Sequence, residues 1–208
     1  MVGQGVLREC LLADDVEVVL VVGRSSIGKS DPKLREIVHS DLTSYTAIEA
    51  QLAGYDACFF CLGVSAAGMT EAEYTRITYD ATLAAANVLA RLSPTMTFIY
   101  VSGAGTDSTE HKRAMWARVK GKTENALLAL PFKAVMFRPG LIRPLHGIRS
   151  KTRMYRLAYA ALWPLFPVLS LFGALTTTER VGRAMLRVAR EGSPTKLVTN
   201  REIDQLAA

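Results

Sequence analysis

The stretch TFIYVSGAG at residues 97–105 decides the class of fold. It is an apolar run, rich in aromatic and β-branched residues, that stops at a serine and a glycine, as a strand buried on both faces does. Helical segments separate it from similar runs. Because such strands alternate with helices, the sequence predicts an α/β fold with a doubly wound parallel sheet. The other runs are VEVVLVVGR (16–24), REIVHSDL (35–42), DACFFCLG (56–63), FKAVMFRPG (132–140) and TKLVT (195–199).

Helix signals frame these strands. An apolar stripe with Val6 and Cys10 begins at once in MVGQGVLREC, so a helix opens the chain and no strand comes before it. Thr70 and Glu73 form a capping box for a helix that runs towards Leu92. A last helix is expected over about 178–190, before the final strand.

Length and composition limit the class of protein. The 208 residues fit one domain, 1–208, with 50% hydrophobic residues. A net charge of +6 favours an anionic partner such as a phosphorylated cofactor, nucleic acid or a membrane surface. Nucleic acid is not expected, because no aromatic platform or known module accompanies the charge.

The cysteines indicate a reducing compartment. Three cysteines and no secretory signal predict a cytoplasmic protein without a disulfide framework. Cys58 and Cys61 form a C-x-x-C, but within a strand, positions three apart point to opposite faces. We therefore expect buried cysteines and no metal site.

Ligands of doubly wound sheets bind at the carboxyl ends of the strands. Arg24 follows the 16–24 run, where dinucleotide folds place an acid for the ribose or an arginine for a 2′-phosphate. No acid occupies the tip VVGRSS, so Arg24, with Ser25 beside it, indicates NADP rather than NAD. A solvated loop arginine is the alternative. Gly3 and Gly5, at the start of the first helix, suit either a phosphate or a tight turn.

Two further strand ends supply candidates for the cofactor site. The Asp41 carboxylate is placed to accept from an adenine amino group while Leu42 packs on the ring. Asp41 is equally suited to cap the helix that follows it. Gly63, after the 56–63 run, leaves room for the ribose.

The last candidates come from the strands at 97–102 and 132–138. Ser102 places a hydroxyl at the cleft floor, and Pro139 with Gly140 forms a rigid turn near the expected nicotinamide. Trp116 and Lys120 share one face of a helix between these strands. Their spacing alone does not separate a catalytic pair from ordinary helix surface.

With these residues in place, the chain resembles the atypical, or extended-type, short-chain dehydrogenase/reductase superfamily, and its branch with the Tat-interacting oxidoreductase and bacterial epimerase/dehydratase-like proteins. The motifs that carry the resemblance are VVGR, YVSGAG, WARVKGKTE and FRPGLI, in this order. The resemblance implies a Rossmann-like fold that binds NAD(P). It also implies that Ser102 polarises a carbonyl and that Lys120 holds the nicotinamide ribose.

The chain departs from this family twice. The family begins with a strand and a T-G-x-x-G-x-x-G loop, of which only Met1, Val2 and Gly3 have counterparts, so the first strand is lacking. The family also has a tyrosine four residues before the lysine, where Trp116 stands. An indole N–H donates a hydrogen bond but cannot ionise as the acid/base does. Proton transfer would then fall to water, Tyr79 or Tyr74.

The function implied is an NADP-dependent oxidoreductase or epimerase-like enzyme, catalytically weak, acting on a small carbonyl or sugar-like substrate. The alternative is a non-catalytic NADP-binding regulator or scaffold. Residues 149–177 read as an apolar segment on the substrate side. Their stretch 157–175 has no charge, but Pro164 and Pro167 disfavour a membrane span. Peripheral membrane contact is compatible with this segment, and a homodimer is a further candidate partner state of the chain.

Overall fold

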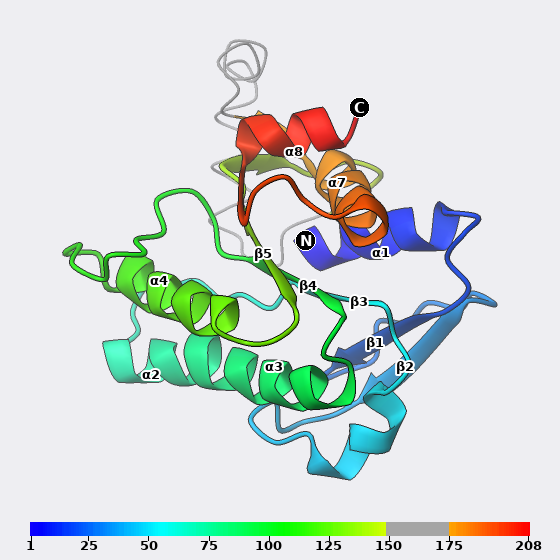
Figure 1. The fold of residues 1–208 in the computed structure, drawn as a ribbon, viewed down its shortest axis with the longest axis horizontal. Coiled ribbons are helices and arrows are strands. Elements are labelled where there is room, and N and C mark those ends of the chain that lie inside the picture. Colours follow the sequence, from blue (N-terminus) through cyan, green and yellow to red (C-terminus); the bar gives the residue numbers. More distant parts are fainter. Residues whose placement is uncertain (149–174) are drawn as a thin grey trace.

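The computed structural model describes residues 1–148 and 175–208 (Figure 1). Helices and strands alternate along most of this part of the chain, as the sequence predicts. In chain order the elements are α1 (Val2–Leu12), β1 (Val19–Gly23), β2 (Leu34–Val38), η1 (Thr46–Leu52), β3 (Ala57–Phe60), α2 (Glu71–Thr75), η2 (Arg76–Asp80), α3 (Ala81–Leu92), β4 (Thr97–Val101), α4 (Met115–Leu128), β5 (Lys133–Arg138), β6 (Leu141–Arg143), β7 (Leu175–Thr177), α7 (Thr178–Glu191), β8 (Leu197–Thr199) and α8 (Asn200–Leu206).

Every strand pair in the described residues is parallel. The strands form a β1–β2 pair, a four-stranded sheet in the order β3–β4–β5–β8, and a short β6–β7 pair. The expected parallel α/β architecture is confirmed. Among the described residues, β1 and β3 are not paired with each other.

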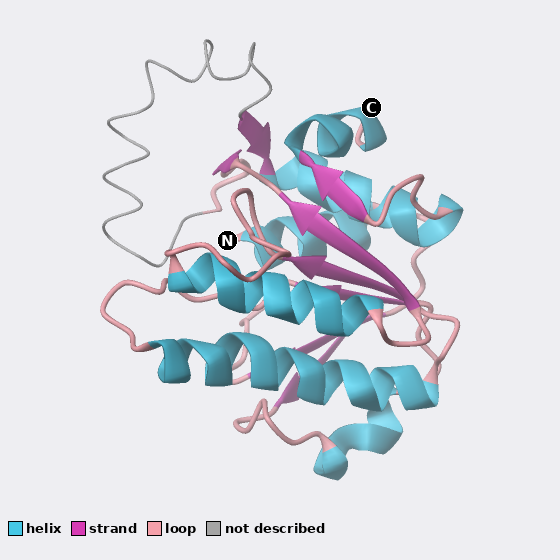
Figure 2. Cartoon of the chain, turned by 60° about the vertical axis from the view of Figure 1, so that its left-hand side comes forward, coloured by secondary structure: helices cyan, strands magenta, loops and turns pink. Residues whose placement is uncertain are grey.

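Helices cover both faces of the sheet, with α3 and α4 on one side and α1 and α7 on the other (Figures 1 and 2). The alternation of side chains along β4 serves both layers. Phe98 and Tyr100 belong to the core under α3 and α4, whereas Ile99 belongs to the core under α1 and α7. All three are at most 1% exposed, so the centre of β4 is closed on both faces.

The predicted helix boundaries largely hold. Thr70 and Glu73 form the expected capping box, and α7 ends one residue beyond the expected 190. The helix from Glu71 to Leu92 contains a feature that the sequence did not indicate, a π-helical turn over Arg76–Asp80. This turn shifts the phase of α3 relative to α2, because each π-helical bond spans one more residue than an α-helical bond.

The region around 149–177 is described only in part. Leu175–Thr177, at its end, forms β7 and pairs with β6, and the rest of the apolar segment lies outside the described residues. Across 1–148 and 175–208, no helix combines the length and the apolar character that crossing a bilayer requires.

Candidate active site

The loops that follow β4 and β5 run side by side at the carboxyl edge of the sheet. The backbone N–H groups of Ser102 and Gly103 donate to the Phe137 carbonyl at 2.9 and 3.3 Å, and that of Ala104 donates to the Pro139 carbonyl at 2.8 Å. These bonds continue the β4–β5 pairing past the strand ends. The candidates Ser102 and Pro139 thus each take part in one of these neighbouring hydrogen bonds.

Lys120 reaches this edge from α4. Its ammonium donates to the backbone carbonyl of Ser102. Burial, only partly offset by the Glu124 carboxylate, lowers the pKa of Lys120 to about 8. The lysine is therefore held at the end of β4, and its amine loses its proton far more readily than a solvated lysine does.

The Ser102 hydroxyl is already engaged. It is 2% exposed and donates to the Phe137 carbonyl at 3.2 Å. A hydroxyl has one proton to donate, so in this arrangement Ser102 can accept a hydrogen bond from a ligand but cannot also donate to a carbonyl. The role that the resemblance implies for Ser102 would require its hydroxyl to turn.

Trp116 lies one helical turn before Lys120 and packs over the loop after β4. A Cβ at Gly105 would come 3.1 Å from Trp116 Cη2, and Gly105 has a φ of +88°. Both facts favour glycine there, since the loop passes directly under the indole. Trp116 thus forms a half-buried wall next to Lys120 and brings no ionisable group.

The two tyrosines offered as other proton donors lie elsewhere. The Tyr79 ring faces the Lys122 ammonium at 4.7 Å. Lys122 is two positions from Lys120 and so about 200° around α4, which puts Tyr79 on a different face of that helix. Tyr74 is only 2% exposed. Neither phenol has the exposed position beside Lys120 that a group donating a proton to the substrate would need.

A buried ion pair between α4 and the end of β5, which the sequence did not indicate, holds these elements together. The Glu124 side chain is fully buried, and Arg138 Nε donates to it at 3.0 Å. A second guanidinium nitrogen also contacts Glu124 and donates to Ser108 Oγ at 2.5 Å. The pair joins α4, the end of β5 and the loop after β4, so it fixes the helix that carries Lys120.

The loop between β4 and α4 is also closed on itself. The Asp107 carboxylate accepts from the backbone N–H groups of Thr109, His111 and Lys112 at 2.8–3.1 Å. Together with the Thr109 hydroxyl, these bonds hold the pKa of Asp107 well below its usual range. A Cβ at Gly121 would overlap the Asp107 carbonyl. A glycine in the middle of a helix is a sequence signal that could have indicated this close backbone approach.

The three glycines considered for the cofactor site have different surroundings. Gly63 is exposed, and a Cβ there would meet nothing within 4 Å. Gly3 lies in the first turn of α1, where a Cβ would come 3.3 Å from Cys61 Cβ at the end of β3. Gly5, for which the sequence left both a phosphate and a tight turn open, packs against another helix. A Cβ there would lie 2.6 Å from Thr178 Cβ, so Gly5 serves the packing of α1 on α7.

The residues expected to read the adenosine half follow β1 and β2. Arg24 and Ser25 are exposed directly after β1. Asp41 accepts from the Thr43 N–H at 2.9 Å and from its hydroxyl at 2.6 Å, which lowers the pKa of Asp41. Its carboxylate therefore forms a local turn ahead of η1, while Leu42 packs partly against the core under α3.

The candidate Gly140 follows β5. Its N–H donates to Asn200 Oδ1 at 3.0 Å, at the start of α8.

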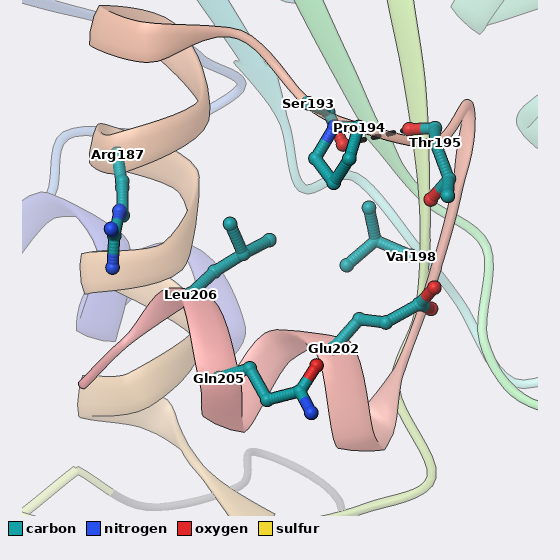
Figure 3. Close-up of a pocket in the computed structure, with 8 residues that line it drawn as sticks. All are labelled: Arg187, Ser193, Pro194, Thr195, Val198, Glu202, Gln205 and Leu206. Carbon is teal, nitrogen blue, oxygen red and sulfur yellow. Dashed lines mark hydrogen bonds between the residues drawn. The ribbon is translucent and has the colours of Figure 1, made fainter.

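No described residues gather into a group of three or more metal-ligating side chains. Cys10, Cys58 and Cys61 are free thiols, and burial raises the pKa of each to about 12. A cavity of about 230 Å³ lies between α7, α8 and the start of β8 (Figure 3). Its polar side chains already serve local structure: Glu202 caps α8 and Arg187 pairs with Glu191. We assign it no role.

The parallel sheet with helices on both faces defines a Rossmann-like α/β fold. Solved structures share this fold. The Helicobacter pylori ADP-L-glycero-D-manno-heptose-6-epimerase matches with a TM-score of 0.68 and 16% identity over 100% of this chain and 78% of its own. The Bordetella bronchiseptica enzyme WbmF, in complex with NAD⁺, matches with a TM-score of 0.67 and 17% identity over 99% of this chain and 73% of its own. This chain therefore shares the Rossmann-like fold of these enzymes, which is the fold that the resemblance predicts.

Sequence relatives carry less functional information. No protein-family model matches the chain. Protein FMP52-2, mitochondrial, of Scheffersomyces stipitis is 28% identical over 199 residues, which cover 92% of this chain and 84% of that protein. The name places that relative in mitochondria, so a cytoplasmic location for this chain stays a prediction.

Proposed function

We propose that this protein binds a nicotinamide dinucleotide along the carboxyl edge of its sheet and acts as a slow NADP-dependent oxidoreductase or epimerase-like enzyme on a small carbonyl or sugar-like substrate. The observation that carries the proposal is the meeting of Lys120 with Ser102 at the end of β4. Ligands of such sheets bind at this edge. Solved structures with the same fold include WbmF with NAD⁺.

The residues present fit such a ligand. The first turn of α1 offers N–H groups and the positive end of a helix dipole for a phosphate, and the open space at Gly63 suits a ribose. The Lys120 ammonium would hold the nicotinamide ribose, with Pro139 beside the ring. A bound nicotinamide supplies the hydride, which the side chains themselves cannot do.

Proton transfer is the step that makes the enzyme slow. Trp116 cannot exchange a proton in this pH range, and the Ser102 hydroxyl already donates its hydrogen bond to the Phe137 carbonyl. Water is then the proton carrier at the site. Because general acid/base catalysis contributes about 10²- to 10⁴-fold, its loss lowers the rate without abolishing hydride transfer.

Arg24 supports NADP as the preferred form, since its exposed guanidinium follows β1 and can pair with a 2′-phosphate. Calorimetry with NADPH and NADH tests this directly. We expect Arg24→Ala to weaken NADPH binding about 10- to 100-fold and to leave NADH binding unchanged. Arg35→Ala is the control, because Arg35 is an exposed arginine on β2 that donates to the Pro32 and Leu34 carbonyls. Equal affinities for the two cofactors would overturn the NADP preference, and no binding of either would overturn the whole proposal.

The presence of Trp116 favours a second candidate, a non-catalytic NADP-binding regulator or scaffold. The two candidates differ in their response to Trp116→Tyr, assayed with NADPH on a panel of aldehydes and ketones. A gain of about 10²-fold or more indicates an enzyme that has lost its acid. No turnover in either form, with NADPH binding intact, indicates the regulator. Membrane contact through 149–177 and a homodimer both stay predictions for either candidate.

A further inference from the structure

The loop that follows β4 carries a lysine whose ammonium is turned back onto the candidate site. Lys112 is exposed, yet its Nζ donates to the Gly105 carbonyl at 3.2 Å. Gly105 is the glycine under the indole, since a Cβ there would come 3.1 Å from Trp116 Cη2. Trp116 lies one turn of α4 before Lys120. Contacts therefore lead from Lys112 through Gly105 and Trp116 to the lysine at the end of β4.

The backbone of Lys112 is held at both of its polar groups. Its N–H donates to Asp107 Oδ2 at 2.8 Å, and its carbonyl accepts from the Arg118 guanidinium at 2.6 Å. Arg118 also pairs with Glu71 of α2. The loop is tied to α4 once more, because the Asp107 N–H donates to the Ala117 carbonyl at 3.1 Å. The side chain of Lys112 thus starts from a fixed position, as a binding group should.

No carboxylate of the described residues forms an ion pair with Lys112, and the acids closest to it in sequence are engaged elsewhere. The Asp107 carboxylate accepts from three backbone N–H groups and a threonine hydroxyl, Glu110 accepts from an amide side chain of α4, and Glu124 pairs with the arginine at the end of β5. An ammonium has three protons, and the neutral carbonyl takes one of them. The charge of Lys112 and its other two protons are therefore available to an anion.

The spacing along the loop limits the size of a ligand that uses both ends of this arrangement. Ser102 and Gly105 are three positions apart, so their Cα atoms lie within about 11 Å of each other. A molecule that reaches from Lys120 to Lys112 is therefore small, and the Trp116 indole offers it an apolar surface. One ammonium matches the single charge of a carboxylate, whereas a phosphate carries up to about two charges at neutral pH.

We propose that Lys112 determines substrate specificity, and that the substrate is a small carbonyl compound that also bears a carboxylate, which the Lys112 ammonium binds. The carbonyl then lies at Ser102 and Lys120, and the body of the molecule packs on Trp116. This inference rests on the proposed function for the place of the carbonyl, and it goes beyond that function in naming the charge of the substrate.

Calorimetric titration with two matched aldehydes tests the proposal. The probes are 4-carboxybenzaldehyde, which is an anion, and 4-formylbenzamide, which has nearly the same shape without the charge. Each is titrated with and without NADP⁺, which cannot reduce an aldehyde. We expect the unmodified protein to bind the acid at least about tenfold more tightly than the amide, because hydrogen bonds between charged groups are the stronger ones. Lys112→Met should abolish this preference, and Lys112→Arg should keep it.

Lys122→Met is the matched control, because Lys122 is an exposed lysine of α4 whose ammonium lies over the Tyr79 ring. It removes the same charge from another face of the helix, so the preference for the acid should persist. Equal binding of the two aldehydes, no binding of either, or a preference that survives Lys112→Met would overturn the inference. NADP⁺ titrated alone reports on the proposed function separately. Binding of the acid through Lys112 without binding of NADP⁺ would support the anion site and overturn the proposed function.

Discussion

Strands β3 and β4 are neighbours with similar apolar sequences and different burial. Phe98, Ile99 and Tyr100 in β4 are at most 1% exposed, whereas Phe59 and Phe60 in β3 are only partly buried. The difference is one of edges, because β4 pairs on both sides and β3 on one among the described residues. In a doubly wound sheet, helices on both faces do not bury a strand unless both of its edges are also covered.

The candidate site divides along the same line. Ser102 and Lys120 come from the closed half, with β4, β5 and α4, where hydrogen bonds and a buried ion pair fix them. Arg24 and Asp41 come from the β1–β2 half. The proposed chemical end of the site is therefore held by these bonds, whereas the residues proposed to select the cofactor lie on the β1–β2 pair.

The largest expected effect is on the core of the closed half. Phe98 is fully buried and stacks on Phe132 with ring centroids 4.8 Å apart. Phe98→Ala should lower the free energy of unfolding by about 3–5 kcal/mol, because it removes buried surface and leaves a cavity. Phe60→Ala in β3 is the matched control, and about half that loss is expected because Phe60 is partly exposed. Urea denaturation measures both, and equal losses would contradict the difference between the halves.

The next largest effect concerns the buried ion pair. Glu124→Gln keeps the size of the side chain but leaves the Arg138 guanidinium without its anionic partner, at an expected cost of about 2–3 kcal/mol. Glu71→Gln is the control, because Glu71 pairs with Arg118 at the surface, where such pairs contribute about 0.5 kcal/mol. Urea denaturation compares the two variants. Similar small losses would mean that Glu124 does not hold α4 to β5.

Local patterns predicted much of the fold and part of the site. The apolar runs, their glycine ends and the Thr70 capping box depend on neighbouring residues, so the strand order along the chain and the edge at Ser102 could be predicted. The meeting of Ser102 with Lys120 followed from the resemblance. Its geometry is consistent with the rule that parallel strands end at one edge.

What the sequence did not indicate depends on tertiary contacts. Glu124 and Arg138 are 14 positions apart and become partners only when α4 packs beside β5. The π-helical turn at Arg76–Asp80 has no composition signal of its own. The packing role of Gly5 was not predicted, because a glycine that admits a phosphate and one that admits another helix look alike in sequence. Thr178, against which Gly5 packs, is 173 residues away.

The third effect is a pH dependence that only the closed half should show. Burial lowers the pKa of Lys120 to about 8 from an ordinary value of 10.5. Between these two values the unfolded chain binds more protons at this lysine than the folded chain does, so its contribution makes the free energy of unfolding rise with pH from about 8 to 10.5. Lys120→Met should remove this rise.

Urea midpoints at several pH values between 7 and 10.5 measure this effect, as the difference between the unmodified protein and Lys120→Met. Subtracting the two profiles removes the contributions of all other titrating groups. Lys120→Arg is the control for a side chain that stays charged throughout this range. A difference profile that is flat from pH 8 to 10.5 would show that Lys120 is solvated.

The smallest effect is expected in β1. Val21 is half-buried on a strand with one open edge, so Val21→Ala should lower the free energy of unfolding by no more than about 0.5–1 kcal/mol. Val135→Ala in β5 is the matched change at a residue that is 6% exposed, and about 2 kcal/mol is expected there. Equal costs in the unmodified chain would mean that β1 is already covered in solution, and the two halves would then not differ.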